Sequence, residues 1–512
     1  MSQLPKIERA RSRFRNPLGK YKIYRGKECQ HCGLCAQLCP QGVHQQLGKR
    51  MLAPDDELCW GPSCREYEFC CLNRCPQGAL SLSVNPSLAA LKDYRWTPDL
   101  LIATWQQAET GTLPYTDVEY RVGESGGGFD RLRFRFPPAM TVGQISDEEE
   151  VPISLLLNRR KDGRPQVEIA LPFYGGGMSF GSVSLTTMLC RAKAAQAWDT
   201  FTCTGEGGYP EELRQYDHHM ITQVATGLFG VREETIKRVR IVEFKYAQGA
   251  KPGLGGHLLG DKVTPAVALM REAVAGSSLF SPFPFHSVYS VEDHKKHVDW
   301  IKEVNPHCLV AVKVSTPTDV DMVAVGIYYA GAHIIHLDGS YGGTGAAPDI
   351  AKKNIAMPIE YAIPKVHRFL KEEGIRDQIT LMVSGGIRTA YDIAKAIALG
   401  ADGAVIGTAD LVALECIRCR NCESGRGCPR GIATTDPELS RLLDKGWGAQ
   451  RIINLYAAWR KQLIAILKIL GLKNIRELVG RTDLLYHLDY AQENIVEDDL
   501  RPIIKENNRR NN

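Results

Sequence analysis

The sequence predicts an α/β fold in which a (β/α)8 TIM barrel occupies the middle of the chain. From about residue 165 to 440, short apolar runs alternate with helical stretches, and RVRIVEFKYA (238–247) and CLVAVKVS (308–315) are typical of buried strands. Several such runs end in glycine-rich loops, as the strands of a barrel do at its upper face. A cysteine-rich unit precedes this region, and a helical pattern follows it.

The composition excludes several classes of protein. Hydrophobic residues make up 44% and charged residues 24% of the chain, and the formal net charge is +5, which is ordinary for a soluble globular protein. No apolar run reaches the roughly 18 residues of a membrane span, and the basic N-terminus lacks the apolar core of a secretory signal. We therefore expect a cytoplasmic protein that has no membrane span and no nucleic-acid partner. The basic N-terminal arm is either a solvated tail or a docking element for an acidic partner.

The 16 cysteines are clustered, with nine between residues 29 and 75 and four between residues 416 and 428. Because thiols stay reduced in the cytoplasm, such clusters indicate metal binding rather than disulfides. The first run is Cys29, Cys32, Cys35 and Cys39, and with Pro40 it has the C-x2-C-x2-C-x3-C-P spacing of bacterial ferredoxins. In that motif the fourth cysteine binds the other of two clusters.

A second, irregular run ends in the same way, since Cys71 and Cys75 repeat the final C-x3-C-P spacing. We therefore expect two 4Fe-4S clusters. The expected ligands of one are Cys29, Cys32, Cys35 and Cys75, and those of the other are Cys59, Cys64, Cys71 and Cys39. Cys70 lies directly beside Cys71, and the sequence does not separate these two as ligands.

A third group, Cys416, Cys419, Cys422 and Cys428, comes soon after a glycine loop at Gly407. An iron–sulfur cluster there suits electron delivery to a cofactor held by that loop, and a zinc knuckle is the alternative. The chain therefore divides into a two-cluster ferredoxin-like domain (1–82), a connector (83–164), the barrel (165–440) with its cysteine loop (416–428) and a C-terminal helical extension (441–512). The string PQVEIALPF (165–173) alternates as a first barrel strand does, and SGGGFDRL (125–132) is typical of a flexible turn.

Glycine-rich loops follow three of the predicted strands. The segments GAHIIHLDGSYGGTGAAP (331–348) and LMVSGGIRTAYDIAKAIALGADGAVIGTA (381–409) contain buried strands that open into such loops. Consecutive strands with glycine loops are typical of the phosphate-binding end of a TIM barrel, where backbone N–H groups hold the anion. They predict a phosphate-bearing cofactor, bound by Gly342, Gly343, Thr344, Gly345, Gly385, Gly386, Gly407 and Thr408. Glycine turns that only let a strand meet a helix are the alternative.

Charged residues in and beside four further loops, 175–184, 203–208, 222–230 and 247–260, are candidates for chemistry. Lys245 and Lys251 supply cations that suit the polar edge of a flavin or a substrate carboxylate. Glu206 stands between two glycines and is a candidate proton donor or amine partner. His257 either contacts substrate or forms a structural hydrogen bond. The alternative for the lysines and the glutamate is a surface charge or a helix-end residue.

Long, ordered segments of the chain form a specific pattern. They include GMSFGSVS (177–184), TGEGG (204–208), QVATGLFGV (223–231), AQGAKPGLGG (247–256), GGTGAAP (342–348) and CPRGIATTDPEL (428–439). These segments resemble the synthase domain of the glutamate synthase family, and the ferredoxin-like unit in front makes the chain look like the short archaeal-type form. The resemblance implies FMN in the barrel, with Gly177, Met178 and Ser179 against the ring, Gln223 and Lys245 at its polar edge, and Gly385, Gly386, Gly407 and Thr408 at the phosphate. It also implies that Glu206, Lys251 and Arg271 lie close to the site of 2-oxoglutarate.

The chain departs from this family in five features. No glutaminase domain precedes the barrel and residue 2 is not a cysteine, so we expect ammonia from a separate glutaminase or from free ammonium. His257 replaces a glutamine near the substrate, Leu254 replaces an acidic residue, and Tyr341 replaces an aspartate before the glycine loop. The third cysteine group has the spacing C-x2-C-x2-C-x5-C-P instead of C-x5-C-x4-C-P, so it holds either a 4Fe-4S or a 3Fe-4S cluster.

Three hypotheses follow from this resemblance. In the first, the protein forms L-glutamate by reductive amination of 2-oxoglutarate through 2-iminoglutarate on FMN. Its electrons come from a ferredoxin or a partner reductase, because no nicotinamide-binding fingerprint is evident in the sequence. In the second, the protein forms N-methylglutamate from methylamine and glutamate, which His257 and Tyr341 favour. In the third, it is an electron-transfer subunit of a larger complex. We also expect it to be oligomeric.

Overall fold

The computed structural model describes residues 4–14, 17–91, 93, 95–114, 118–123, 128–137, 150–344, 347, 350–352, 354–423 and 426–488. Within these residues, eight parallel strands form a closed barrel. In order they are β8 (Phe173–Gly175), β9 (Thr202–Cys203), β10 (Met220–Ala225), β11 (Ile241–Lys245), β14 (Leu309–Ser315), β15 (Ile334–Asp338), β16 (Thr380–Ser384) and β17 (Gly403–Ile406), which pairs with β8. The predicted (β/α)8 barrel is therefore confirmed.

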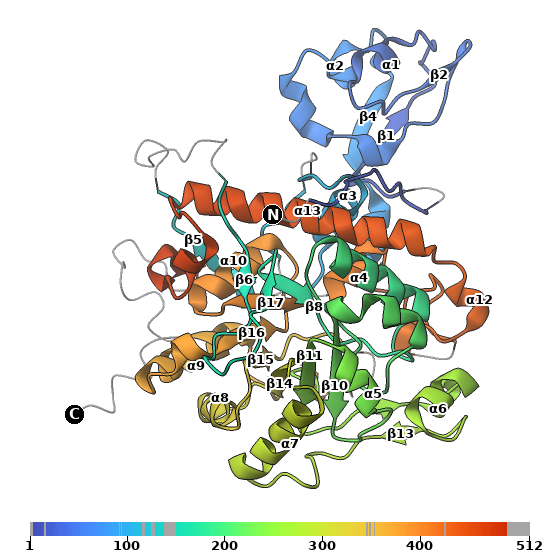
Figure 1. Ribbon diagram of the computed structural model, residues 1–512. Helices are drawn as coiled ribbons and strands as arrows, with labels where there is room; N and C mark the ends of the chain where they lie inside the picture. The colour runs from blue at the N-terminus through green and yellow to red at the C-terminus, as the bar shows by residue number, and fades with distance from the viewer. Residues whose placement is uncertain are drawn as a thin grey trace.

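Helices follow the strands and cover the barrel (Figure 1). They are α4 (Leu185–Ala197), α5 (Glu233–Arg238), α7 (Val291–Val304), α8 (Val320–Tyr329), α9 (Ile359–Glu372), α10 (Ala390–Leu399) and α11 (Thr408–Ala413). The helices α4, α7 and α10 begin after Ser184, Ser290 and Thr389, whose side-chain oxygens each accept a backbone N–H three residues on. Such caps satisfy donors that a helix start otherwise leaves unpaired. After β11 an excursion carries β12 (His257–Leu258), α6 (Pro265–Arg271) and β13 (Leu279–Phe280).

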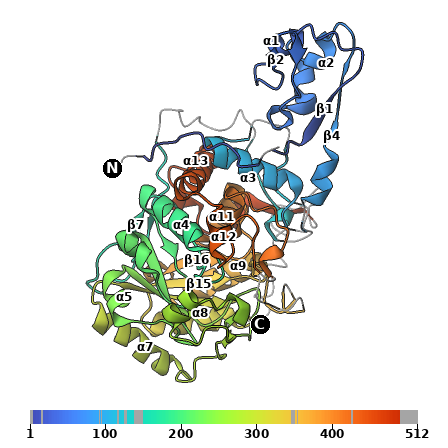
Figure 2. The same ribbon diagram turned by 90° about the vertical axis from the view of Figure 1, so that its right-hand side faces the viewer.

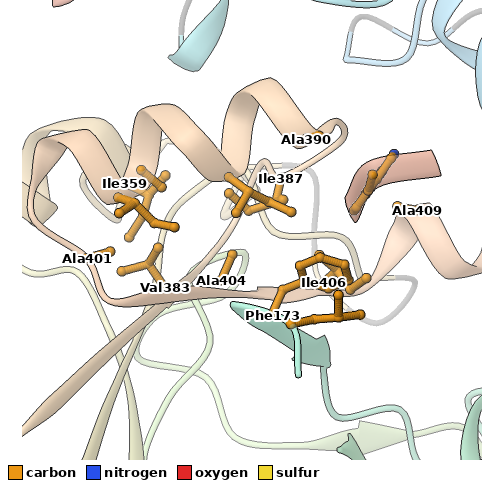
Figure 3. Close-up of a cluster of buried hydrophobic side chains, with 14 of the residues drawn as sticks. Phe173, Ile359, Val383, Ile387, Ala390, Ala401, Ala404, Ile406 and Ala409 are labelled. Carbon is orange, nitrogen blue, oxygen red and sulfur yellow. The ribbon is translucent and has the colours of Figure 1, made fainter. Parts of the chain in front are cut away.

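Apolar side chains fill the space between the strands and the outer helices. Figure 3 shows part of this core, in which Phe173, Val383 and Ile406 of the barrel strands pack with Ile359 of α9 and Ala390 of α10. All five side chains are inaccessible to solvent. Burial of an aliphatic or aromatic side chain of this size stabilises a fold by about 1.5–3 kcal/mol. This core fixes the strand ends from which the functional loops start.

Residues 165–173 do not form one strand, so this prediction is wrong. Glu168–Ile169 (β7) pairs antiparallel with Leu155–Leu156 (β6), and the first barrel strand begins only at Phe173. Pro172 lies between the two, and a proline has no N–H to donate to a sheet. The apolar side chains of the hairpin join the core at the amino ends of the barrel strands. The alternating pattern therefore belongs to a hairpin that closes the lower end of the barrel.

The connector is ordered at residues 128–131, where we predicted a flexible turn, so that prediction is wrong for these residues. They form a short 3-10 helix in which Phe129 is fully buried. Asp130 forms a buried ion pair with Arg388 at the start of α10, which holds the segment against the barrel. Residues 125–127 of the predicted turn lie outside the described part of the chain.

The N-terminal unit stands at one side of the molecule, and both views place α3 and α13 between it and the barrel (Figures 1 and 2). Its elements are β1 (Tyr21–Arg25), α1 (Leu34–Leu38), β2 (Gln46–Leu47), β3 (Arg50–Met51), α2 (Cys71–Arg74) and β4 (Leu80–Val84), and β1 pairs antiparallel with β4. The connector then supplies α3 (Pro98–Thr110) and β5 (Leu132–Phe134).

The C-terminal extension is helical only in part. It contains α13 (Lys445–Ile469), which follows the short α12 (Pro437–Ser440) and packs against α3 and α4. Beyond α13, β18 (Leu485–His487) pairs antiparallel with β5 of the connector. In the described ranges, no helix has both the length and the apolar character that a membrane crossing requires. The division into four domains that we drew from the sequence remains a proposal.

Candidate active site

A buried charged cluster lies at the carboxyl ends of the barrel strands. Lys245, the last residue of β11, has its Nζ 3.3 Å from Oε1 of Glu206, which follows β9. Arg271 at the end of α6 donates to Ser179 Oγ at 3.1 Å and to the Glu206 carbonyl oxygen at 3.4 Å. Lys251 is only 3% exposed and interacts electrostatically with Glu206 and Lys245. The structure therefore brings together three of the four predicted catalytic residues, with Lys245 beside them.

The electrostatics of this cluster keep a carboxylate ionised in a buried place. Burial alone favours the neutral acid, but Lys245, Lys251 and Arg271 together hold the pKa of Glu206 below its usual value. Burial and the neighbouring Lys245 lower the pKa of Lys251 to about 8. The site therefore combines a stable anion with a lysine that loses its proton within the physiological range.

His257, the fourth predicted catalytic residue, lies at the edge of this cluster. Its ring stacks on Phe280 of β13 with the ring centroids 4.5 Å apart. The preceding Gly256 lies against the charged cluster, because a Cβ on Gly256 would be 2.4 Å from Glu206 Oε1. The backbone at Gly256 and His257 therefore lies next to the charged cluster, whereas the His257 ring contacts Phe280 of β13.

The residues predicted to lie along a flavin ring also converge. A Cβ on Gly177 would be 2.7 Å from Gln223 Nε2, and a Cβ on Gly205 would be 2.7 Å from the backbone nitrogen of Ser179. A Cβ on Gly407 would lie 3.6 Å from Met178 Cε. The short distances show that the first barrel loop lies directly against Gln223 of β10 and against the last barrel loop. Only glycine fits at Gly177 and Gly205 without displacing a neighbour.

The loops predicted to hold a phosphate face one another. A Cβ on Gly343 would be 2.8 Å from Thr408 Oγ1, and a Cβ on Gly385 would be 2.5 Å from the carbonyl oxygen of Gly339. Gly385 and Gly386 have φ of 97° and 118°, which side chains rarely adopt. The loops 342–344, 385–386 and 407–408 thus lie at one end of the barrel. Gly345, also predicted to bind, lies outside the described residues.

A chain of buried hydrogen bonds inside the barrel escaped the sequence analysis. Gln223 Nε2 donates to Glu243 Oε1 at 2.6 Å, and Glu243 Oε2 lies 2.8 Å from His336 Nδ1. The other His336 nitrogen is 2.8 Å from Ser384 Oγ, which donates to Asp338 at 2.6 Å. Asp338 also pairs with Lys313 at 3.3 Å. Although both carboxyl groups are buried, the neighbouring Lys313 and His336 hold the pKa values of Glu243 and Asp338 below their usual range. The signal in the sequence was a polar residue in the middle of an otherwise apolar strand.

The N-terminal cysteines form two groups. A pocket is lined by Cys29, Cys32, Cys35 and Cys75, the expected ligands of one cluster, and by Cys71. In the second group, burial and neighbouring thiols raise the pKa of Cys59 to about 11 and that of Cys64 and Cys71 to about 12. The thiol of Cys71 interacts electrostatically with those of Cys39, Cys59, Cys64 and Cys70. All five candidate ligands of the second cluster therefore lie close together. Among the described side chains, no group of three or more His, Cys, Asp or Glu has the geometry of a bound metal ion.

The third cysteine group lies next to the loop at Gly407. Helix α11 starts at Thr408 and has six residues, so Cys416 comes after about 9 Å of helix. Burial raises the pKa of Cys416 to about 11, and Cys428 is also buried. Two anchors hold this loop, since Arg418 pairs with Asp93 of the connector at 2.6 Å and Lys262 Nζ donates to the Cys422 carbonyl oxygen at 2.6 Å.

Comparison with known proteins identifies the family of the chain. A family model described as the conserved region in glutamate synthase matches residues 140–473. The archaeal-type glutamate synthase (NADPH) of Thermotoga maritima is 36% identical over 485 residues, which cover 90% of this chain and 92% of the relative. The archaeal glutamate synthase (NADPH) of Archaeoglobus fulgidus is 35% identical over 494 residues, which cover 91% of this chain and 94% of the relative.

A solved flavocytochrome b2 variant with benzoylformate aligns over 70% of this chain and 76% of its own, with a TM-score of 0.44 and 16% identity, a likeness too distant to bear on function. The family model spans the barrel and the third cysteine group, and each of the two relatives is aligned over about nine-tenths of the chain. The chain therefore belongs to the glutamate synthase family of oxidoreductases.

Proposed function

We propose that the protein is an iron–sulfur flavoprotein that forms L-glutamate by FMN-dependent reductive amination of 2-oxoglutarate through 2-iminoglutarate. The observation that carries this proposal is the buried cluster of Glu206, Lys245, Lys251 and Arg271 at the same end of the barrel as the three glycine loops. A dicarboxylate substrate needs cations in a site that excludes water, and a phosphate-bearing cofactor needs backbone N–H groups close by.

The residues around the cluster fit FMN. Gly177 and Gly205 let the first barrel loop, the loop after β9 and the Gln223 side chain approach one another closely. The loops 342–344, 385–386 and 407–408 lie at one end of the barrel, where we propose that they form a cradle for a phosphate. In this proposal Gly177, Met178 and Ser179 lie along the ring, and Gln223 and Lys245 contact its polar edge. The amide of Gln223 is oriented by its hydrogen bond to Glu243 at 2.6 Å. Bound FMN supplies the hydride that reduces the imine carbon.

The chain's own side chains bind and orient the substrate. Lys251 and Arg271 bind the two carboxylates of 2-oxoglutarate, because both are buried cations next to Glu206. Glu206 stays ionised and stabilises the positively charged nitrogen of protonated 2-iminoglutarate. Lys251, with its pKa of about 8, holds a proton at the site below that pH.

The cysteine groups fit iron–sulfur clusters, which transfer single electrons. The pocket formed by Cys29, Cys32, Cys35 and Cys75 supports one 4Fe-4S cluster, and Cys39, Cys59, Cys64 and Cys71 or Cys70 are proposed to hold the second. Cys416, Cys419, Cys422 and Cys428 are proposed to hold a 4Fe-4S or 3Fe-4S cluster near the cofactor. We propose that a ferredoxin or a separate reductase supplies electrons, and that ammonia comes from a separate glutaminase or from free ammonium in the cytoplasm.

A turnover assay tests this function against its alternatives. Chemically reduced protein is incubated with 2-oxoglutarate and ammonium, and the products are identified by mass spectrometry. Formation of glutamate that depends on both substrates supports the proposal. Formation of N-methylglutamate from methylamine and glutamate supports the second hypothesis instead. Reduction of an external acceptor with neither product supports a role as an electron-transfer subunit.

A further inference from the structure

Arg95, a residue of the connector, reaches one of the proposed phosphate loops. Its side chain is buried, with 4% of its surface exposed, and its Nη2 lies 3.4 Å from the carbonyl oxygen of Gly386. A Cβ on Gly386 would lie 2.6 Å from the same nitrogen. The glycine at this position therefore leaves the space that the guanidinium group occupies.

An aromatic ring holds the guanidinium group in place. The Arg95 guanidinium carbon lies 3.8 Å from the centroid of the Tyr341 ring, which is a stacking distance. Tyr341 directly precedes Gly342 and Gly343, whose loop faces Thr408. The stacked pair thus connects the loop that begins after Tyr341 with the loop at Gly386.

The backbone around Arg95 is also anchored. Asp93 Oδ1 accepts the backbone N–H groups of Arg95 and Trp96, each at 2.8 Å, and Asp93 Oδ2 accepts from Arg418 at 2.8 Å. Since Arg418 belongs to the third cysteine loop, this segment of the connector is tied to both proposed cofactor loops. Such anchoring reduces the conformational entropy that Arg95 loses when it binds an anion.

Two carboxyl groups, Asp130 and Glu360, face this region. Asp130 is bonded to the guanidinium group of Arg388 through both of its oxygens. Glu360, at the start of α9, accepts the Gly128 N–H, and burial raises the pKa of its carboxyl group to about 7. Arg388 is bonded to Asp130 and Asp392, and Arg95 is a second buried cation at the Gly386 loop.

We infer that Arg95 is a cofactor-binding residue, which the connector contributes to the phosphate end of the barrel and which Tyr341 holds in place. Its planar group of N–H donors suits a phosphate dianion better than any apolar part of a flavin. This inference rests on the proposed function, since it requires a phosphate-bearing flavin in the barrel. It assigns to residues before the barrel a direct part in selecting FMN over the same flavin without phosphate.

The test compares two ligands that differ only in the phosphate group. Apoprotein stripped of flavin is titrated with FMN and with riboflavin, and binding is followed by quenching of flavin fluorescence. Loss of a charge-assisted hydrogen bond in Arg95→Met should raise the Kd for FMN about 10- to 100-fold. The Kd for riboflavin should change by less than about twofold, because riboflavin makes no phosphate contact.

The chain offers a matched control in Arg160. Its guanidinium carbon lies 4.1 Å from the centroid of the Tyr328 ring, and its Nε donates to the Ala332 carbonyl oxygen at 2.6 Å. Ala332 precedes β15, so Arg160 forms the same kind of stacked, carbonyl-bonded pair at the opposite end of the barrel. Arg160→Met should leave the ratio of the two Kd values unchanged.

The outcomes separate this inference from the proposed function. If wild-type apoprotein binds neither flavin, the proposed function fails. If the wild-type apoprotein binds FMN, and Arg95→Met weakens the binding of both flavins equally or of neither, the inference alone is overturned. Should Arg95→Met not fold, Arg95→Lys carries the same test, because it keeps the charge and loses the planar donors. We then expect FMN binding about 3- to 10-fold weaker with riboflavin unchanged, and an equal change in both would overturn the inference.

Discussion

Lys245 Nζ lies 3.3 Å from Glu206 Oε1, and this ion pair joins the end of β11 to the loop that follows β9. Both side chains are mostly buried, with 9% and 16% of their side-chain surface exposed. Because a buried carboxylate needs cationic neighbours to stay ionised, the pair and its neighbours Lys251 and Arg271 act as one electrostatic unit. The following predictions concern this unit and the elements around it.

Replacement of Glu206 by glutamine should separate catalysis from cofactor binding. The amide no longer stabilises a positively charged imine nitrogen, so we expect kcat/KM for amination of 2-oxoglutarate to fall by about 100-fold or more. The content of bound flavin, measured after heat release, should stay within the error of the wild type. Glu212→Gln, at an exposed position of the same segment between β9 and β10, is the control. A variant with near wild-type activity would exclude Glu206 from the reaction.

Substrate binding should weaken as the pH rises through the pKa of Lys251. The pKa of this lysine is lowered to about 8 by burial and by Lys245, so its charged form is present below that pH and lost above it. Since kcat/KM reports the free enzyme, its value for 2-oxoglutarate should decline with an apparent pKa near 8. Lys251→Arg should retain activity and move this decline to higher pH. A decline that persists unchanged in Lys251→Arg would assign it to another group.

Glu360→Gln should stabilise the protein in a pH-dependent way. Burial raises the pKa of this carboxyl group from 4.5 to about 7 in the folded state, so the neutral form is favoured by the fold. In the unfolded chain the Glu360 carboxyl group ionises with its ordinary pKa of 4.5. As the pH rises from 4.5 to about 7, the unfolded state is therefore increasingly favoured, by up to about 3 kcal/mol. We therefore expect a thermal midpoint about 2–5 °C higher for the variant at pH near 8 and little gain near 4.5. An equal gain at both pH values would point to a different cause.

The second N-terminal cluster should depend on Cys71 rather than on Cys70. Cys71 keeps the C-x3-C-P spacing with Cys75, and the Cys70 thiol is fully buried beside Cys64. We expect Cys71→Ser to lose about four iron atoms per chain and Cys70→Ser to retain them. Iron analysis together with electron paramagnetic resonance of the reduced protein distinguishes the two. The reverse result would exchange their assignments.

Much of the fold was predictable because its signals are local. Buried strands such as Leu309–Ser315 are continuous apolar runs, and loops such as Gly385–Gly386 need glycine for their backbone geometry. The alternating string before Phe173 misled us, because a hairpin beneath the barrel shows the same period of two as a strand within it.

The parts of the site that we missed depend on contacts between residues far apart in the chain. The pairing of Glu243 with His336 follows from the order of strands around the barrel, which no local pattern contains. Arg95 lies 291 residues before Gly386, and its contact arises only when the connector packs on the barrel. In contrast, Glu206 and Lys251 stand in glycine-rich loops at strand ends, where position along the chain already indicates a shared face.

The central claim is tested most directly by anaerobic stopped-flow mixing of the fully reduced protein with 2-oxoglutarate and ammonium. The account predicts that the absorbance band of oxidised flavin returns and that one glutamate forms for every two electrons that the flavin and the clusters together give up, while omission of ammonium prevents glutamate formation. Protein that is replete in iron but lacks a flavin band, or a flavin band that returns without glutamate, would contradict it.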